Sequence, residues 1–257
     1  MKAQVTIAVI GKGRLGTAYA TAIRSKSNPY KLFGHFSVRE GSFETLFEGG
    51  GPEVIIIATK DDAIAETAWR ATSFAGDNLQ LIVHSAGSQP SSILPKLPKV
   101  GRLMLHPIQT FPKGDPALFK GITFAAECTG KESLAFAKAF TKSLGATNVI
   151  RLTTKQLPLY HAMTVFAANF ITLLGASVEK LSSELHLDKK AVKKALAPLM
   201  RASLENVLNN DAASVLTGPI ARNDQATIAS HLKALRNSPE LKALYTAFLK
   251  LAAMKSH

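Results

Sequence analysis

The sequence predicts an α/β protein: a doubly wound, mostly parallel sheet followed by an all-helical part. Three observations support this prediction. Short apolar stretches rich in β-branched residues alternate with helical patterns as far as residue 152. A glycine-rich turn directly follows the first of these stretches. From residue 153 onward the strand pattern is absent, so we expect one domain at 1–152 and a second at 153–257.

The first strand, at 5–10, leads into the motif G-K-G-R-L-G at 11–16, and an alanine-rich helix follows. In such a motif Gly11 allows a tight turn, Gly13 lets backbone approach a diphosphate, and Gly16 lets the helix pack on the strand. The start of the helix then offers free N–H groups and partial positive charge to phosphates. This predicts a Rossmann dinucleotide-binding domain. Its expected cofactor-binding residues are Gly11, Gly13, Arg14, Leu15 and Gly16.

The second strand is expected at 30–38, and its end indicates which dinucleotide binds. NAD-selective sites place an acid there, about 20 residues past the glycine motif, on the ribose 2′-hydroxyl. This sequence has Ser37 and Arg39 instead, followed by Glu40. Because a guanidinium pairs with a 2′-phosphate, we expect NADP in preference to NAD.

The remaining elements of the first domain follow in order. After a short helix at 44–47 and a glycine turn, a buried strand at 53–59 ends at Thr59, which we place in the cofactor site. Further strands are expected at 80–84, 102–112, 122–126 and 148–152, and helices at 63–72, 91–94 and 131–144. This alternation predicts parallel pairing with right-handed crossovers.

Polar residues collect where the middle strands end. The strand at 80–84 runs into Ser85-Ala86-Gly87-Ser88, a loop whose N–H groups and two hydroxyls could hold a substrate carboxylate. A plain turn is the alternative. His106, at the exit of the next strand, is a candidate proton donor, and His84 is a weaker candidate.

The second domain begins with apolar residues from 162 to 176 that nearly encircle a helix, which predicts a buried helix too short and too polar to span a bilayer. Positions 161, 165 and 169 are four apart and share one stripe of it. His161 could exchange the proton that accompanies hydride transfer, and Asn169 could fix a carbonyl oxygen. Alternatively, His161 only satisfies a neighbouring carbonyl.

Further helices are expected from residue 188, over 224–235 and from residue 239. The loop T-G-P-I-A-R-N-D at 217–224 precedes the second of them. Arg222 in this loop could clamp a substrate acid through two hydrogen bonds, or it could pair with Asp224.

Composition limits the partners. The formal net charge of +13 favours anionic ones, such as a phosphorylated cofactor and a small acidic substrate. Nucleic acid is not expected, because aromatic residues are not interleaved with the basic ones. Cys128 is the single cysteine, which excludes a disulfide framework and a multi-cysteine metal site. We expect no metal, no signal peptide, no membrane association and a cytoplasmic location.

Four motifs together resemble a family of bacterial proteins with a Rossmann-like N-terminal domain and a helical C-terminal domain of unknown function. They are V-I-G-K-G-R-L-G at 9–16, H-P-I-Q-T-F at 106–111, Y-H-A-M-T-V-F-A-A-N-F at 160–170 and T-G-P-I-A-R-N-D at 217–224. Members of that family are often labelled as candidate NADP oxidoreductases. The resemblance covers nearly the whole chain.

More remotely, the architecture resembles the 6-phosphogluconate dehydrogenase superfamily, which includes β-hydroxyacid dehydrogenases, ketopantoate reductase and pyrroline-5-carboxylate reductase. In its hydroxyacid members a lysine and an asparagine four residues later carry out the proton transfer. This resemblance places His161 and Val165 at that pair, with Asn169 one turn further, and it implies a homodimer.

Residues and resemblance together predict an NADP(H)-dependent oxidoreductase that reduces a carbonyl or imine of a small anionic substrate. Its expected catalytic residues are His161, His106 and Asn169, and its expected substrate-binding residues are Ser85, Ser88 and Arg222. Because the superfamily's lysine is missing, the alternative is a protein that binds NADP(H) as a sensor or interaction module without turning it over.

Overall fold

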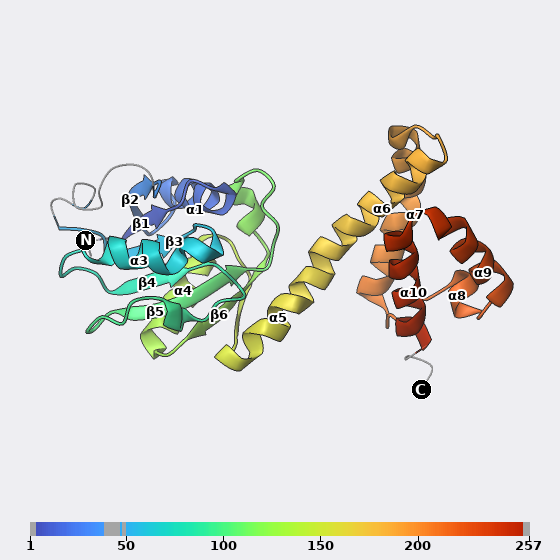
Figure 1. The fold of residues 1–257 in the computed structure, drawn as a ribbon. Coiled ribbons are helices and arrows are strands. Elements are labelled where there is room, and N and C mark those ends of the chain that lie inside the picture. The colour runs from blue at the N-terminus through green and yellow to red at the C-terminus, as the bar shows by residue number, and fades with distance from the viewer. Residues whose placement is uncertain (1–3, 39–46, 48–49, 254–257) are drawn as a thin grey trace. The chain divides into compact units, whose positions relative to one another are not determined.

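The computed structural model describes residues 4–38, 47 and 50–253. Contacts between residues divide the chain into two compact units, 1–169 and 170–257. The first contains the sheet and the second is helical (Figure 1). Helical structure begins earlier than the second unit, at residue 154, so helix α5 (Leu157–Thr164) belongs to the sheet unit.

The sheet has seven strands in the order β2-β1-β3-β4-β5-β6-β7. Their bounds are Thr6–Ile10 for β1, Lys31–Phe36 for β2, Val54–Ile57 for β3, Leu81–His84 for β4, Gly101–Pro107 for β5, Thr123–Cys128 for β6 and Asn148–Arg151 for β7. Every neighbouring pair is parallel except β5 and β6. The predicted doubly wound, mostly parallel sheet is therefore confirmed.

The antiparallel pairing of β5 with β6 is where the expected strand–helix alternation was wrong. A parallel pair needs a crossover, usually an α-helix. The segment between these strands contains only the 3-10 turn η3 (Pro116–Phe119), so the chain returns alongside β5 in the opposite direction. Consequently β5 is the last strand whose carboxyl end lies at the same edge as those of β1, β3 and β4.

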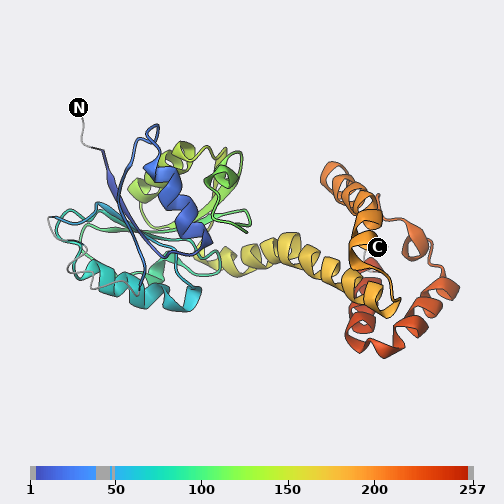
Figure 2. The same ribbon diagram turned by 90° about the horizontal axis from the view of Figure 1, so that it is seen from above.

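Helices cover both faces of the sheet (Figure 2). On one face lie α1 (Arg14–Arg24) and α4 (Lys131–Ser143), and on the other lies α3 (Ile64–Thr72). Alternate residues of β1 point to the two cores: Ile7 and Val9 to the α1/α4 side, and Ala8 and Ile10 to the α3 side. This two-sided burial explains why the strands have nearly continuous apolar sequences.

The short helical turns of the sheet unit are η1 (Asp61–Ala63), η2 (Ser91–Ile93) and η4 (Thr154–Gln156). The turn η2 agrees with the short helix predicted at 91–94. The turn η1 leads into α3, which agrees with the helix predicted at 63–72. The helix predicted at 44–47 lies almost entirely outside the described residues.

The helical part continues from α5 through a π-helical turn, η5 (Val165–Asn169), into α6 (Phe170–Glu184). The remaining helices are α7 (Lys189–Asn209), α8 (Gly218–Ala221), α9 (Gln225–Ala234) and α10 (Pro239–Ala253). Their starts follow from capping: the side chain of Asp188 accepts a hydrogen bond from Ala191 N, and that of Asp224 accepts one from Thr227 N.

The helix predicted to be buried at 162–176 is instead largely exposed. Met163 and Leu173 are each 58% exposed. The prediction was wrong for a physical reason. A helix with apolar side chains on nearly every side must be buried against other groups, but its sequence does not show that those groups belong to the same chain. The helical stretch Thr154–Glu184 contains an 18-residue window with mean hydropathy 1.4, so by length and composition alone it could cross a membrane, a test that core helices also pass.

Candidate functional site

The glycine motif forms the predicted turn between β1 and α1. Gly11 has φ +122°, and a Cβ on it would lie 2.3 Å from the carbonyl oxygen of Ala58. A Cβ on Gly16 would lie 1.8 Å from the carbonyl oxygen of Gly11, whereas one on Gly13 would meet nothing within 4 Å. Gly11 and Gly16 are thus required by the fold, and Gly13 leaves open space beside the loop.

Helix α1 begins at this open space. Gly13 is its N-cap residue, and its first turn contains Arg14 and no acid. A helix of 11 residues with its first N–H groups uncovered by a side chain suits a diphosphate. The side chain of Leu15 is half-buried and packs against the core between α1 and the sheet. The residues present therefore fit a dinucleotide at this loop.

Strand β2 fixes the glycine loop from the other side. The N–H of Gly11 donates to the carbonyl oxygen of Phe36 over 2.8 Å, and Nε2 of His35 donates to the carbonyl oxygen of Gly11 over 3.0 Å. Ser37, directly after β2, is half-buried, and Arg39 lies outside the described residues. Thr59 follows β3, and its hydroxyl donates to the carbonyl oxygen of Lys60.

The serine loop after β4 is held by the protein. The Oγ of Ser85 lies 3.3 Å from the hydroxyl of Tyr19, and the Oγ of Ser88 donates to the carboxylate of Asp61 over 3.2 Å. A Cβ on Gly87 would lie 2.9 Å from Cγ of His106. The loop therefore rests directly on the His106 ring, and glycine is the residue that permits this.

His84 has a structural role in the same loop. Its Nε2 donates to the carbonyl oxygen of Pro90 over 3.2 Å, and its Nδ1 accepts from the N–H of Ala86 over 3.3 Å. Burial lowers the pKa of His84 to about 4. With both ring nitrogens occupied, a neutral His84 holds the turn and has no hydrogen-bonding atom left for a ligand.

His106 lies at the carboxyl end of β5 and contacts two residues of α5. Its Nδ1 is 2.6 Å from the hydroxyl of Tyr160, and its ring centroid is 6.2 Å from that of His161. Burial, reinforced by the neighbouring His161, lowers the pKa of His106 to about 4, although Asp61 acts in the opposite direction. Burial raises the pKa of Tyr160 to about 12. Two of the three candidate catalytic residues, His106 and His161, are thus brought together.

His161 has an unusual environment. Its Nδ1 is enclosed and has no hydrogen-bond partner. Among the side-chain nitrogen and oxygen atoms of residues 4–38, 47 and 50–253, this is the one that is both buried and unpaired. Leaving such a group unpaired costs about 1–3 kcal/mol. Unpaired buried polar atoms are rare in folded proteins, so this one sets the environment of His161, next to His106, apart from the rest of the core.

Comparison with known proteins gives the family. Residues 122–251, just over half of the chain, match the model of a domain of unknown function, DUF2520. The chain belongs to the DUF2520 family. This matches the resemblance found in the sequence motifs. A search among curated proteins finds no match.

Solved structures show the fold of this DUF2520 protein. A candidate NADP oxidoreductase from Bacteroides fragilis is 23% identical, with TM-score 0.78 over 97% of this chain and 98% of that one. A protein from Thermotoga maritima is 21% identical, with TM-score 0.70 over 96% and 97%. Pyrroline carboxylate reductase from Plasmodium falciparum, solved with NADP bound, is 16% identical, with TM-score 0.60 over 98% and 97%.

Asn169 does not join the cluster around His106 in the sheet unit, and Arg222 belongs to the second unit. Asn169 is exposed at the end of the π-helical turn, so its amide remains in solvent and does not need the buried partner that the sequence suggested. Arg222 follows α8 in the second unit. Its expected partner, Asp224, caps α9 through Thr227, and no ion pair between them is found in the described part of the chain.

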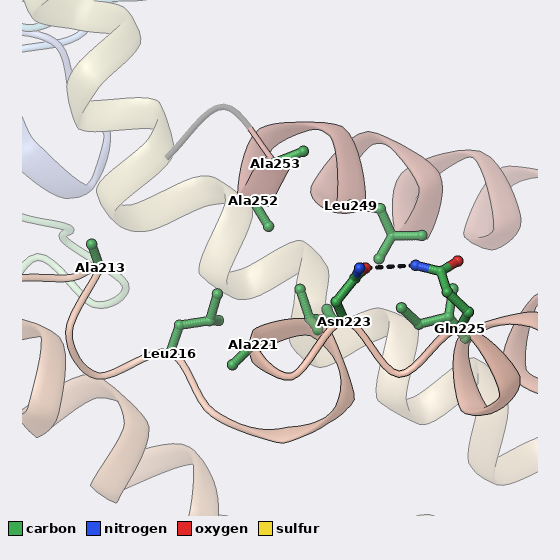
Figure 3. Close-up of a pocket in the computed structure, with 10 residues that line it drawn as sticks. Ala213, Leu216, Ala221, Asn223, Gln225, Leu249, Ala252 and Ala253 are labelled. Carbon is green, nitrogen blue, oxygen red and sulfur yellow. Dashed lines mark hydrogen bonds between the residues drawn. The ribbon is translucent and has the colours of Figure 1, made fainter. Parts of the chain in front are cut away.

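The second unit has a cavity of its own, of about 750 Å³ (Figure 3). It is lined by apolar side chains, including Leu216 and Leu249, and by Asn223 and Gln225, whose amides are joined by a hydrogen bond of 2.6 Å. Within the described residues 50–253, none of the residues that line it is titratable. The titratable side chains of the described candidate sites are therefore those of the His106 cluster.

Three polar groups of the DUF2520 protein's sheet unit were not predicted from the sequence: the hydroxyl of Tyr160, the carboxylate of Asp61 and the imidazole of His35. Only Tyr160 gave a signal, through its position next to His161. Its partner is 54 residues away in the chain, so no local pattern could reveal the contact. Among the described residues, no group of three or more His, Cys, Asp or Glu side chains could hold a metal ion.

Proposed function

We propose that this protein is an NADP(H)-dependent oxidoreductase that reduces a carbonyl or imine of a small anionic substrate. The observation that carries the proposal is the position of two features at one edge of one sheet. The open start of α1 follows β1, and the His106 cluster lies at the end of the parallel strand β5. In open α/β sheets ligands bind along this edge. The names of two similar structures, which refer to NADP, also support it.

The proposed cofactor site is formed by the N-terminal part of the sheet unit, at the edge where β1, β2 and β3 end. Gly13 and the first N–H groups of α1 bind the diphosphate, with Arg14 alongside. Ser37 and Arg39 bind the 2′-phosphate, and Thr59 lies beside the loop at the end of β3. A bound nicotinamide dinucleotide would supply the hydride.

The proposed substrate site lies at the serine loop and the His106 cluster. The N–H groups of residues 85–88 bind the acid group of the substrate, with Arg222 as a second candidate for that role. Addition of a hydride to carbon leaves an electron pair on the oxygen or nitrogen, which then needs a proton. His161 or His106 provides it.

A second copy of this chain is the proposed partner, and a reducing cytoplasm is the proposed setting. Helices α5 and α6 expose large apolar side chains, and no Asp, Glu, Lys or Arg occurs between Gln156 and Val178, where His161 is the single titratable imidazole. Contiguous apolar surface of this kind is covered by protein or by lipid. A second copy offers the same uncharged surface and can pair with it symmetrically. The single buried cysteine, Cys128, suits a reducing compartment.

Two measurements test the enzyme proposal. Calorimetric titration should show tighter binding of NADPH than of NADH, and Arg39→Ala should remove the difference. NADPH absorbance should fall in the presence of a 2-keto acid, a 3-keto acid or a cyclic imine, and His161→Ala should abolish the change. Binding of neither dinucleotide would refute the proposal. Binding without turnover of any of these substrates would support the sensor alternative instead.

A further inference from the structure

We propose that Tyr160 is a positioning residue that fixes the tautomer of His106, so that His106 offers an N–H from Nε2 to the substrate while His161 carries the proton that is transferred. The hydrogen bond itself follows from the geometry of the sheet unit. Its use in a reduction rests on the proposed function, and the two parts are tested separately below.

The first step is the contact between the two side chains. The hydroxyl of Tyr160 lies 2.6 Å from Nδ1 of His106, and Tyr160 is only 5% exposed. The backbone of Gly87 covers the same side of the ring: a Cβ there would lie 3.0 Å from Nδ1. Within the described residues, the hydroxyl of Tyr160 is therefore the hydrogen-bond partner of Nδ1.

The second step is the direction of this hydrogen bond. If Nδ1 carried the proton and donated, the O–H of Tyr160 would need a different acceptor, and the described residues provide none. A buried hydroxyl without an acceptor costs about 1–3 kcal/mol. The hydroxyl of Tyr160 therefore donates to Nδ1, which requires a neutral His106 with its proton on Nε2.

The charges around His106 agree with a neutral ring. The titratable groups that face it are Tyr160, His161 and Asp61. Burial and His161 lower the pKa of His106 to about 4, and the pKa of Tyr160 is raised to about 12, so both are uncharged at neutral pH. Two imidazole rings with centroids 6.2 Å apart repel when both are charged, so this contact also favours a neutral His106.

The third step assigns the roles. Nε2 of His106 makes no hydrogen bond within the described part of the chain and is not among its enclosed unpaired atoms, so it is accessible to a ligand. Its N–H donates to the oxygen or nitrogen of the substrate double bond and keeps its proton. As hydride reaches carbon, the electron pair of that double bond moves to the oxygen or nitrogen and takes a proton from the imidazolium of His161, which becomes neutral.

The second unit offers a matched control. The hydroxyl of Tyr245 lies 2.9 Å from Nδ1 of His231, which repeats the same pair of atoms on an exposed surface. Tyr160→Phe and Tyr245→Phe thus remove the same group from the same kind of contact. Only the first is expected to change the site.

Nitrogen NMR of ¹⁵N-histidine-labelled protein tests the tautomer without cofactor or substrate. In the unaltered protein, the His106 signals, identified by their loss in His106→Gln, should show an unprotonated Nδ1 and a protonated Nε2. Tyr160→Phe should give a mixture of both tautomers, and Tyr245→Phe should leave His106 unchanged. A protonated Nδ1 in the unaltered protein overturns the proposal even if Tyr160→Phe does not fold.

Kinetics test the use of the tautomer. Tyr160→Phe should lower kcat about 10- to 100-fold and leave NADPH affinity unchanged, as expected when only the orientation of a neighbouring group is lost. Tyr245→Phe should keep full activity. An unaltered kcat in Tyr160→Phe would refute the positioning role. Absence of turnover in the unaltered protein would instead refute the proposed function and leave the NMR result valid.

Discussion

In the sheet unit Phe140 and Ile56 are at most 1% exposed, whereas in the helical unit Leu173 is 58% and Leu208 is 73% exposed. Both units are rich in apolar residues, but only the sheet has helices on each of its faces. In the described part of the second unit, the buried residues are Ser182, Ile228 and Ser238. The sheet unit therefore closes its own core, whereas the helical unit keeps large apolar side chains exposed.

The two tyrosine–histidine pairs repeat this comparison on a smaller scale. Tyr160 with His106 is partly buried, and Tyr245 with His231 is exposed, although the same two atoms meet in each. In solvent, water replaces either partner at little cost, whereas in the partly buried pair the loss of one partner leaves the other unsatisfied. Burial, not the contact itself, therefore decides which pair can fix a tautomer.

The largest effect is expected at the glycine loop. Gly16→Ala places a methyl group 1.8 Å from the carbonyl oxygen of Gly11, a backbone atom that cannot move away easily. We expect the free energy of unfolding to fall by more than about 4 kcal/mol, measured by urea titration. Gly13→Ala, with open space around it, should keep its stability and lose NADPH affinity. Equal stability of the two variants would contradict this view of the loop.

The next effect compares the two cores directly. Phe140 stacks on Phe136 with ring centroids 5.4 Å apart, so Phe140→Ala should cost about 3–5 kcal/mol of unfolding free energy. Leu208→Ala should change it by no more than about 0.5 kcal/mol in the isolated chain. A large cost at Leu208 that depends on protein concentration would show that a second copy covers it.

A third effect comes from His84, which burial keeps neutral with a pKa of about 4. Below its unfolded value near 6.5 the unfolded chain binds a proton that the folded chain does not. His84 should therefore lower the free energy of unfolding by about 3 kcal/mol as the pH drops from 6.5 to 4, in addition to a similar contribution from His106, whose pKa is also about 4. Urea titrations at several pH values should show this slope, reduced in His84→Gln. His231→Gln, on the exposed surface, should leave the slope unchanged.

The smallest change in the free energy of unfolding is expected for a substitution on α6 that should separate the proposed dimer. Leu173→Glu on α6 introduces a charge at a position already 58% exposed, so unfolding of the isolated chain should change by about 0.5 kcal/mol or less. The molar mass from light scattering should nevertheless fall from two chains to one. Lys138→Glu, on the exposed side of α4, is the control and should remain dimeric. A single-chain mass in the unaltered protein would refute the dimer.

The sequence by itself determined the features that depend on neighbouring residues. The order of strands and helices, the turn at Gly11 and the caps at Asp188 and Asp224 are set by local periodicity and by side chains within a few residues. The glycine motif predicted a cofactor loop because its three glycines act within one turn.

Only the tertiary structure decided which polar groups meet. His106 and Tyr160 are 54 residues apart, and their contact depends on where β5 and α5 come to lie. The same is true of the antiparallel turn to β6, the serine hydroxyls held by Tyr19 and Asp61, and the exposure of the helix at 162–176. The physical reason is that hydrophobic periodicity fixes the face that must be covered, but contains no information on what covers it.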